Sequence, residues 1–289
     1  MYPASFEYHR AGSVSEALSL LERFHDEGKI IAGGHSLLPV MKLRFAQPAH
    51  LIDIRRVPEL QGIREEDGRV VIGAATTHAA VARSELIRRR VPVLAEAAAL
   101  IGDPLVRNMG TIGGSLAHAD PAADLPAVVL ALGAEVRARG RQGERTIAAD
   151  DFFVDLFTSA LAADELLTQV RVPVPPASTG GAYEKYPDPA SGYAVVGVAA
   201  LITLGPGGVV QRARIGLTGL GQKATRATAV EQALAGQGAS AAAIEAACQR
   251  VAEGLDLSDD AGGSAAYKTN LAAVYARRAV TRAAERAGR

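Results

Sequence analysis

Hydrophobic and polar positions follow two different periods along the chain, and each period predicts its own kind of element. Between residues 14 and 27 apolar residues recur three and four positions apart, which predicts an amphipathic helix. Ser13 and Glu16 stand at its start with the spacing of a capping box. Short apolar runs between turn residues predict buried strands instead. These runs lie at the start of residues 29–36 and at residues 51–54, 70–74, 134–138 and 165–172.

The second half of the chain is expected to form a hairpin followed by helices. Residues 193–204 and 209–220 are apolar runs that flank a Gly-Pro-Gly-Gly turn, which predicts two antiparallel strands. Because strands and helices do not alternate regularly, the pattern favours an α+β fold over a regular α/β fold. The helices expected in the whole chain, besides the first, are 37–45, 91–101, 127–132, 226–235, 240–253 and 263–286.

Length and composition set the frame for these elements. A chain of 289 residues is long enough for about two domains, and the stretch 173–181, rich in Pro, Gly and Ser, is the expected linker. The 31 basic and 31 acidic residues give zero net charge. No bulk positive field is therefore available to recruit nucleic acid, and none is expected as a partner.

The number of cysteines and the hydropathy of the chain exclude further classes of protein. The single cysteine, Cys248, cannot close an internal disulfide, hold an iron–sulfur cluster alone or build a structural zinc site. The N-terminus has no apolar signal core. The longest nearly continuous apolar run, residues 193–204, is too short to cross a bilayer as a helix. We therefore expect no transmembrane segment and a reducing, cytoplasmic location.

Two glycine pairs, each closed by serine, are the least ordinary local feature. Adjacent glycines let a backbone approach a ligand and turn its N–H groups toward an anion, most often phosphate. Two such segments suit a diphosphate held from both sides, whereas the alternative for each alone is an ordinary tight turn. Neither a G-x-G-x-x-G nor a P-loop fingerprint is present. The first glycine segment is Ala32, Gly33, Gly34, His35 and Ser36, and the second is Thr111, Ile112, Gly113, Gly114 and Ser115.

The sequences around these segments resemble a known family. AGGHSLLPVMKLR and TIGGSLAHADPAADLP together are similar to the FAD-binding medium subunit of molybdenum hydroxylases, the xanthine dehydrogenase family. That group includes aerobic carbon monoxide dehydrogenase, to whose branch the resemblance is greatest, and quinoline and nicotine oxidoreductases. The resemblance extends over the whole chain.

The resemblance implies a fold and a cofactor. The fold would be an α+β, two-subdomain FAD-binding domain of the vanillyl-alcohol-oxidase (PCMH) type, residues 1–176, with subdomains of about 1–55 and 56–176. Residues 178–289 would form a small α+β domain with a three-stranded antiparallel sheet and helices. FAD would lie between the domains, with both glycine segments around its diphosphate.

Three further side chains are assigned to the FAD site by the resemblance, each with an alternative. Asp124 would accept hydrogen bonds from the polar FAD chain, or it caps the helix that follows. Lys185 would contact the flavin and stabilise its reduced form, or it is a solvated lysine at a strand end. Tyr193 would pack near the ring, or it is a core tyrosine. Leu166 or Leu167 would line the same cavity.

Other polar residues in these stretches carry weaker signals. His35 and His118 lack a metal-binding spacing, so no metal site is expected, and hydrogen bonding near phosphate is the preferred interpretation. Arg107 could offset phosphate charge or pair with Asp103. The serines of the two glycine segments do not lie in G-x-S-x-G, so hydrolase chemistry is not supported and no catalytic residue is expected in this chain.

The resemblance also implies partners. A large subunit would carry molybdenum with molybdopterin, a small subunit would carry two [2Fe–2S] clusters, and the assembly would be a dimer of heterotrimers. Electrons would reach this chain's FAD and leave to an external acceptor. The complex would be cytoplasmic, or peripheral at the inner membrane. Its substrate stays open among carbon monoxide, heterocycles, purines and aldehydes, and a stand-alone FAD oxidoreductase or a non-enzymatic nucleotide-binding protein remain alternatives.

Overall fold

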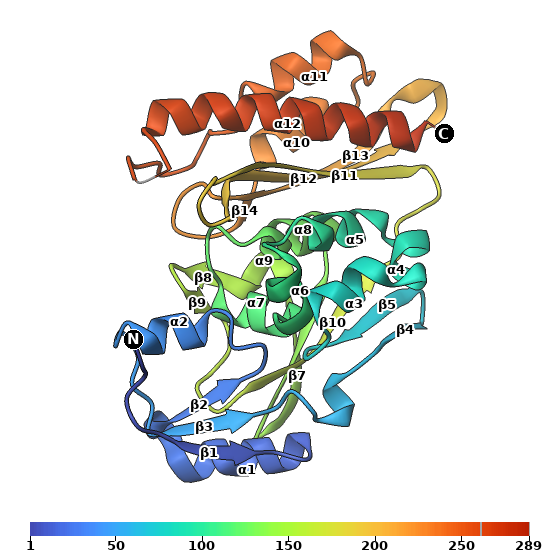
Figure 1. Ribbon diagram of the computed structural model, residues 1–289. Helices are drawn as coiled ribbons and strands as arrows, with labels where there is room; N and C mark the ends of the chain where they lie inside the picture. The colour runs from blue at the N-terminus through green and yellow to red at the C-terminus, as the bar shows by residue number, and fades with distance from the viewer. Residues whose placement is uncertain (261, 289) are drawn as a thin grey trace.

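The computed structural model describes residues 1–260 and 262–288 and shows three stacked layers (Figure 1). The N-terminal layer lies at the bottom of that view, a helix-rich middle layer with its own sheet follows, and the C-terminal sheet with its helices lies on top. Single turns of 3-10 helix lie at His25–Glu27, Pro58–Leu60 and Pro206–Gly208.

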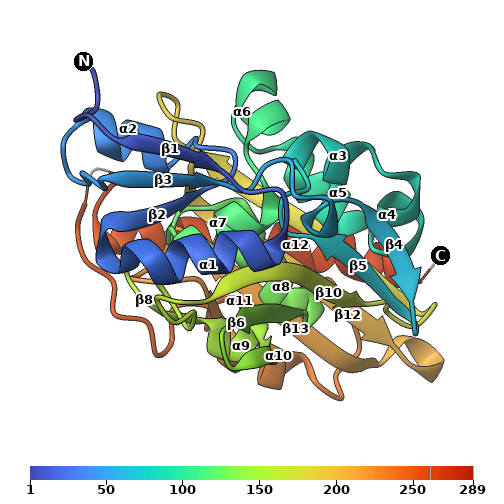
Figure 2. The same cartoon turned by 90° about the horizontal axis from the view of Figure 1, so that it is seen from below.

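The N-terminal layer is a small parallel sheet with strand order β1-β3-β2. Its elements are β1 (Glu7–Arg10), α1 (Val14–Phe24), β2 (Gly28–Ile31), α2 (Leu37–Lys42) and β3 (His50–Asp53). Helix α1 runs alongside the sheet (Figure 2) and begins where expected, because the Ser13 hydroxyl accepts the Glu16 N–H at 3.1 Å. Its apolar stripe, Val14, Ala17 and Leu21, is buried.

The middle layer combines an antiparallel sheet, order β4-β5-β10-β6-β7, with short helices. The sheet strands are β4 (Ile63–Glu66), β5 (Arg69–Gly73), β6 (Glu135–Gly140), β7 (Gly143–Ala148) and β10 (Leu166–Pro173), with β8 (Phe153–Asp155) and β9 (Thr158–Ser159) forming a separate two-stranded ribbon. The helices are α3 (His78–Arg83), α4 (Glu85–Arg90), α5 (Pro92–Ala99), α6 (Pro104–Met109), α7 (Ile112–His118), α8 (Asp124–Leu132) and α9 (Ala149–Phe152).

The C-terminal layer is an antiparallel sheet, order β11-β12-β13-β14, covered by helices. Its elements are β11 (Thr179–Pro187), β12 (Ala194–Leu204), β13 (Val210–Thr218), β14 (Thr225–Arg226), α10 (Thr228–Leu234), α11 (Ala241–Cys248) and α12 (Ala265–Ala287). Helix α12 packs on one face of β11 and β12, while α8 packs on the other face against β12 and β13 (Figure 1). Because both faces of β12 are covered, side chains on both faces are expected to be apolar, which accounts for the continuous apolar sequence of this strand.

Close backbone contacts join the layers. A Cβ on Gly216 would lie 1.9 Å from the Ala127 carbonyl oxygen of α8. A Cβ on Gly180 would lie 1.9 Å from the Ala283 oxygen of α12. Every residue of α8 is buried between its neighbours. The two glycines therefore set how closely α8 and α12 can approach the sheet.

The structure corrects several expected elements. The second glycine segment is not a loop, because Thr111 caps α7 and the glycines form its first turn. The expected linker is partly ordered sheet, since β11 begins at Thr179. The expected three-stranded sheet has a fourth, two-residue strand, β14. The hairpin is confirmed, with β12 and β13 antiparallel from Gly197 opposite Thr218 onward.

Candidate cofactor site

The first glycine segment joins β2 to α2 and lies directly against the chain that precedes α7. Gly33 is buried, and a Cβ there would lie 2.3 Å from the Met109 oxygen and 2.7 Å from Gly110 Cα. Gly34 has a φ of +74°, a left-handed conformation that favours glycine. The structure therefore brings the two glycine segments together, although 77 residues, from 34 to 111, separate them along the chain.

The backbone of the first glycine segment offers donors. Within the described part of the chain, no acceptor takes the N–H groups of residues 32–36. His35 turns back on its own segment, with Nδ1 3.0 Å from the Gly33 oxygen. Successive free N–H groups around a left-handed glycine form a concave site for an anion. This donor set fits a phosphate or diphosphate group.

The second glycine segment contributes differently from what its sequence predicts. Its N–H groups are used inside the protein: Ile112 donates to the Thr76 oxygen, Gly113 to the Ala74 oxygen and Gly114 to the Thr111 hydroxyl, at 3.0, 2.9 and 3.1 Å. The expectation that these N–H groups turn toward a ligand is therefore wrong. What this segment presents is the exposed, bare backbone of Gly114 and the partly exposed Ser115.

Asp124 opens α8 and is the centre of a buried polar cluster. Its carboxylate accepts the Tyr183 hydroxyl at 2.6 Å and pairs with the Lys185 ammonium at 2.9 Å. Burial raises the pKa of Asp124, and the charge of Lys185 and the Tyr183 hydrogen bond oppose that rise. The capping alternative is wrong, because Ala123 occupies the N-cap position and no side chain caps this helix.

Lys185 reaches this cluster from β11 in the C-terminal sheet. Its side chain is 4% exposed, and Nζ also donates to the Leu100 oxygen at 3.2 Å. The solvated-lysine alternative is therefore wrong. The Asp124–Lys185 pair joins the middle layer to the C-terminal layer, and its two charges compensate each other.

Tyr193 lies where the first glycine segment meets the C-terminal domain. It is 41% exposed, so the core-tyrosine alternative does not describe it. Burial of the phenol and the nearby Asp120 raise the pKa of Tyr193, and the Ser36 hydroxyl lowers it. Ser36, Asp120 and Tyr193 therefore share one neighbourhood, although they come from three distant stretches.

Hydrogen bonds to its carbonyl oxygens position the chain that leads into Asp124. Thr218 Oγ1 lies 2.7 Å from both the Pro121 and the Ala123 carbonyl oxygens. The Ala194 N–H donates to the Ala122 oxygen at 3.2 Å. These contacts fix residues 121–124 on the ends of β12 and β13, next to Tyr193.

Some residues near the site were missed by sequence reasoning. Tyr183, fully buried, orients Asp124 and gives no local signal beyond its place in a strand. His78 is buried against Gly110, and its Nδ1 has no partner among the described residues. Burial, with a smaller effect of His35, lowers the pKa of His78 to about 4, so its ring is neutral at pH 7. A buried polar atom without a partner beside the glycine segments fits a site that a ligand completes.

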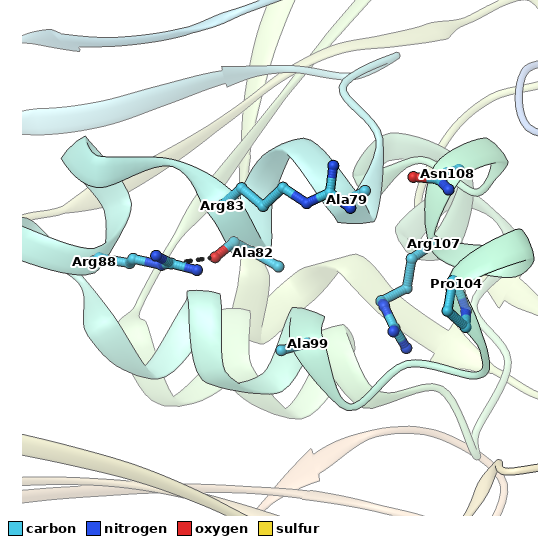
Figure 3. Close-up of a pocket in the computed structure, with 8 residues that line it drawn as sticks. All are labelled: Ala79, Ala82, Arg83, Arg88, Ala99, Pro104, Arg107 and Asn108. Carbon is cyan, nitrogen blue, oxygen red and sulfur yellow. Dashed lines mark hydrogen bonds between the residues drawn. The ribbon is translucent and has the colours of Figure 1, made fainter.

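A small basic cavity of about 240 Å³ lies between α3, α4, α5 and α6 (Figure 3). Arg83, Arg88 and Arg107 contribute its positive charge, and no carboxylate lines it. Within the described chain Arg107 does not pair with Asp103, because its guanidinium donates to the Ile101 and Gly102 oxygens at 2.9 and 3.1 Å. Asp103 instead caps α6.

The structure places the remaining residues named in the sequence analysis as follows. Leu166 and Leu167 are both buried in the core of β10. His118 packs on Phe157, and burial lowers its pKa. Among the described residues, neither His35 nor His118 belongs to a group of side chains close enough to share a metal ion.

Comparison with known proteins accounts for this arrangement. Residues 4–175 match the FAD binding domain in molybdopterin dehydrogenase, and residues 181–283 match the CO dehydrogenase flavoprotein C-terminal domain. The chain is 43% identical to the carbon monoxide dehydrogenase medium chain of Hydrogenophaga pseudoflava over 98% of both chains. It is 42% identical to the 6-hydroxypseudooxynicotine dehydrogenase complex subunit alpha of Paenarthrobacter nicotinovorans, over 99% of this chain and 97% of that one.

A solved structure gives the same result. The carbon monoxide dehydrogenase structure from Hydrogenophaga pseudoflava contains a chain that superimposes with a TM-score of 0.96 at 45% identity, over 99% of both chains. These matches confirm the α+β fold class predicted from the sequence, a PCMH-type FAD-binding domain followed by a flavoprotein C-terminal domain.

Proposed function

This chain belongs to the family of the FAD binding domain in molybdopterin dehydrogenase, and from that premise we propose that it is the FAD-carrying electron-transfer subunit of a molybdenum-containing hydroxylase. The whole complex is of the carbon monoxide dehydrogenase kind. FAD, when bound, supplies redox chemistry that takes up electrons singly and passes them on singly or in pairs. The observation that carries the proposal is the row of free N–H groups at residues 32–36, in a segment packed against Met109 and Gly110, which lead into the second glycine segment.

The chain's own residues divide the work of holding this cofactor. The N–H groups of the first glycine segment bind its diphosphate. Gly114 and Ser115 border the same site without their N–H groups, which α7 already uses. Lys185 and Tyr193 serve the flavin end. Asp124 holds Lys185 in place and supplies the negative charge that compensates the lysine inside the buried cluster.

The other redox centres belong to partner subunits. Cys248 is the chain's single cysteine and is buried, and burial raises the pKa of its thiol to about 12. One cysteine cannot hold an iron–sulfur cluster alone. Two [2Fe–2S] clusters need about eight ligands between them. We therefore place the clusters in a small subunit and molybdenum with molybdopterin in a large one, as a dimer of heterotrimers that delivers electrons to an external acceptor.

The substrate is set by the large subunit. Two relatives of nearly equal similarity, 43% and 42%, carry names that refer to carbon monoxide and to 6-hydroxypseudooxynicotine. Because this chain is about equally similar to both relatives, we infer that its sequence reflects the electron-transfer role and not the substrate. Across residues 1–260 and 262–288, no helix combines the length and the apolarity needed to cross a membrane. From the family resemblance we propose a complex that is cytoplasmic, or peripheral at the inner membrane.

Ser36 offers a clean test of FAD binding. Its side chain is only partly buried and makes no capping hydrogen bond to α2, so Ser36→Asp and Ser36→Asn should both fold. Aspartate adds a negative charge at the free N–H groups and should lower FAD affinity by more than about tenfold, or about 1.4 kcal/mol. Asparagine is the neutral, isosteric control. FAD titration of the apoprotein measures both, and equal affinities would contradict a diphosphate site here.

A further inference from the structure

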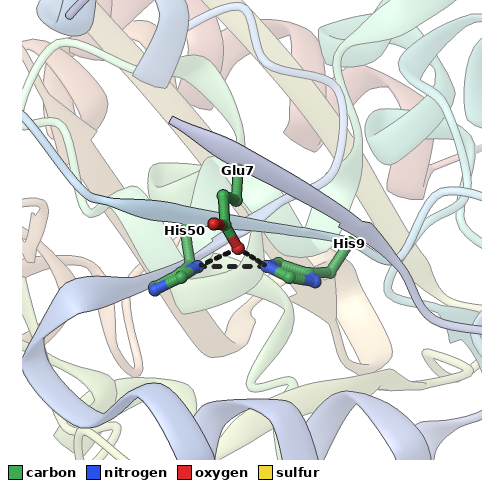
Figure 4. Close-up of side chains that lie close together, drawn as sticks. All are labelled: Glu7, His9 and His50. Atoms are coloured by element: carbon green, nitrogen blue, oxygen red, sulfur yellow. Dashed lines mark hydrogen bonds and ion pairs between the residues drawn. The ribbon is translucent and has the colours of Figure 1, made fainter. Parts of the chain in front are cut away.

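A second group of polar side chains lies on the N-terminal sheet, at the end of the strands opposite the first glycine segment. Glu7 and His9 stand two positions apart on β1 and therefore share a face, and His50 of β3 lies directly opposite Glu7 in the parallel register. Figure 4 shows the three side chains pointing toward one another from the two strands. No motif in the sequence reveals this group, because 41 residues separate His9 from His50.

The three facing atoms form a triangle of the size that a metal ion requires. His9 Nε2 and His50 Nδ1 are 3.1 Å apart, and Glu7 Oε2 lies 3.4 Å from His50 Nδ1 and 3.7 Å from His9 Nε2. A point equidistant from all three lies about 2.0 Å from each, the usual length of a zinc–nitrogen or zinc–oxygen bond. An ion slightly outside the plane of the triangle would keep those lengths and leave a fourth, tetrahedral position open.

The surroundings hold the two imidazoles in this orientation. The Phe24 ring of α1 stacks on His50 with centroids 3.8 Å apart, and it lies 4.6 Å from the His9 ring. Both histidines are partly buried, with 24% and 16% of their side chains exposed, whereas Glu7 is 73% exposed. The site is therefore reachable from solvent through Glu7 and framed on the protein side by an aromatic ring.

We propose that Glu7, His9 and His50 form a binding site for one divalent transition-metal ion of the zinc type. Two neutral imidazoles and a carboxylate are a ligand set that zinc accepts, with water in the fourth position. Without an ion, an imidazole N–H can form a hydrogen bond along only one side of the triangle. A cation instead accepts a lone pair from each of the three ligand atoms. The bound ion ties the edge strand β1 to β3 and, through Phe24, to α1.

The test uses the full FAD-loaded chain and two probes, Zn²⁺ and Co²⁺. The variants Glu7→Gln, His9→Gln and His50→Gln each remove one ligand, and His25→Asn is the matched control, at an exposed histidine that lies near the triangle but outside it. Wild type and His25→Asn should retain one Zn²⁺ per chain after gel filtration. They should also give the intense red-region absorption of tetrahedral Co²⁺.

Each ligand variant should bind at least about tenfold more weakly, because even the loss of a residue that only supports a ligand costs that much. Zn²⁺ should also raise the melting temperature of the wild type and not that of the ligand variants. FAD content checks that every variant folds. The proposal is overturned if the ligand variants bind Zn²⁺ as tightly as His25→Asn, if the Co²⁺ spectrum is that of a six-coordinate ion, or if the wild type retains no metal.

Discussion

Removing the charge of Lys185 is the most direct test of the buried pair that joins the two domains. Lys185→Met keeps the length of the side chain and leaves the Asp124 carboxylate, which is 5% exposed, with the Tyr183 hydroxyl but without a charge partner. At 2.9 Å the two charges attract by about 6 kcal/mol with an effective dielectric constant of about 20. Most of that attraction offsets the cost of burying both groups.

The expected loss of stability follows from what remains after the substitution. Removing one partner of a buried pair costs about 3–5 kcal/mol, because the other charge is left without compensation. Asp124 can escape that state by taking up a proton, so we expect the lower end, about 3 kcal/mol at pH 7. Denaturant unfolding of the apoprotein, followed by circular dichroism, measures the change. Lys223→Met, at an exposed lysine, is the control.

Two further measurements distinguish the loss of the charge pair from a general loss of packing. Without the ammonium, the folded-state pKa of Asp124 rises further above its unfolded value, so the Lys185→Met variant should lose stability as pH rises above about 4. The double variant Asp124→Asn/Lys185→Met buries no charge, so it should recover part of the loss and show no such slope. A loss equal to that of Lys223→Met would refute the reasoning.

The remaining predictions concern the cofactor and the packing. Lys185→Met should lower the flavin reduction potential and Asp124→Asn should raise it, since they remove opposite charges from one pair; potentiometric titration measures both shifts. The isolated FAD-loaded chain should oxidise neither carbon monoxide nor organic substrates with a dye acceptor, and should support oxidation only with the iron–sulfur and molybdenum subunits added. Acid precipitation should release all FAD, because no covalent link is expected. Gly180→Ala should destabilise the fold by about 1–3 kcal/mol in thermal unfolding, because its Cβ meets α12, whereas Gly238→Ala, with open space around it, should not.

The sequence predicts an element correctly where residues close together in the sequence determine its structure. The capping spacing of Ser13 and Glu16 marks the start of α1, and the turn at residues 205–208 joins β12 to β13. The second glycine segment shows the limit. Glycine disfavours helix, yet α7 forms there because Thr111 caps it and because Gly113 must lie against Ala74, where a Cβ would come within 2.6 Å of the Ala74 Cβ.

The sequence predicts which residues form the site, but it does not predict their contacts. The family resemblance pointed to Asp124 and Lys185 separately, and nothing in either local sequence indicates that they pair. Asp124 meets Tyr183 and Lys185 across 59 and 61 residues, so only the packing of α8 on the C-terminal sheet creates the cluster. The triangle of Glu7, His9 and His50 depends in the same way on the register of β1 with β3.

The burial of α8 on all sides has a consequence for synthesis of the chain. All of its nine residues, Asp124–Leu132, except Asp124 are apolar, and they are covered partly by β12 and β13, which follow the helix in the sequence. While the ribosome is still making those strands, the helix has no partner on that side and exposes a surface that favours aggregation. A fragment that stops at residue 176 would keep that surface permanently. We therefore expect the two halves to be recovered from cells only when they are produced together, and early nascent chains to be bound by chaperones.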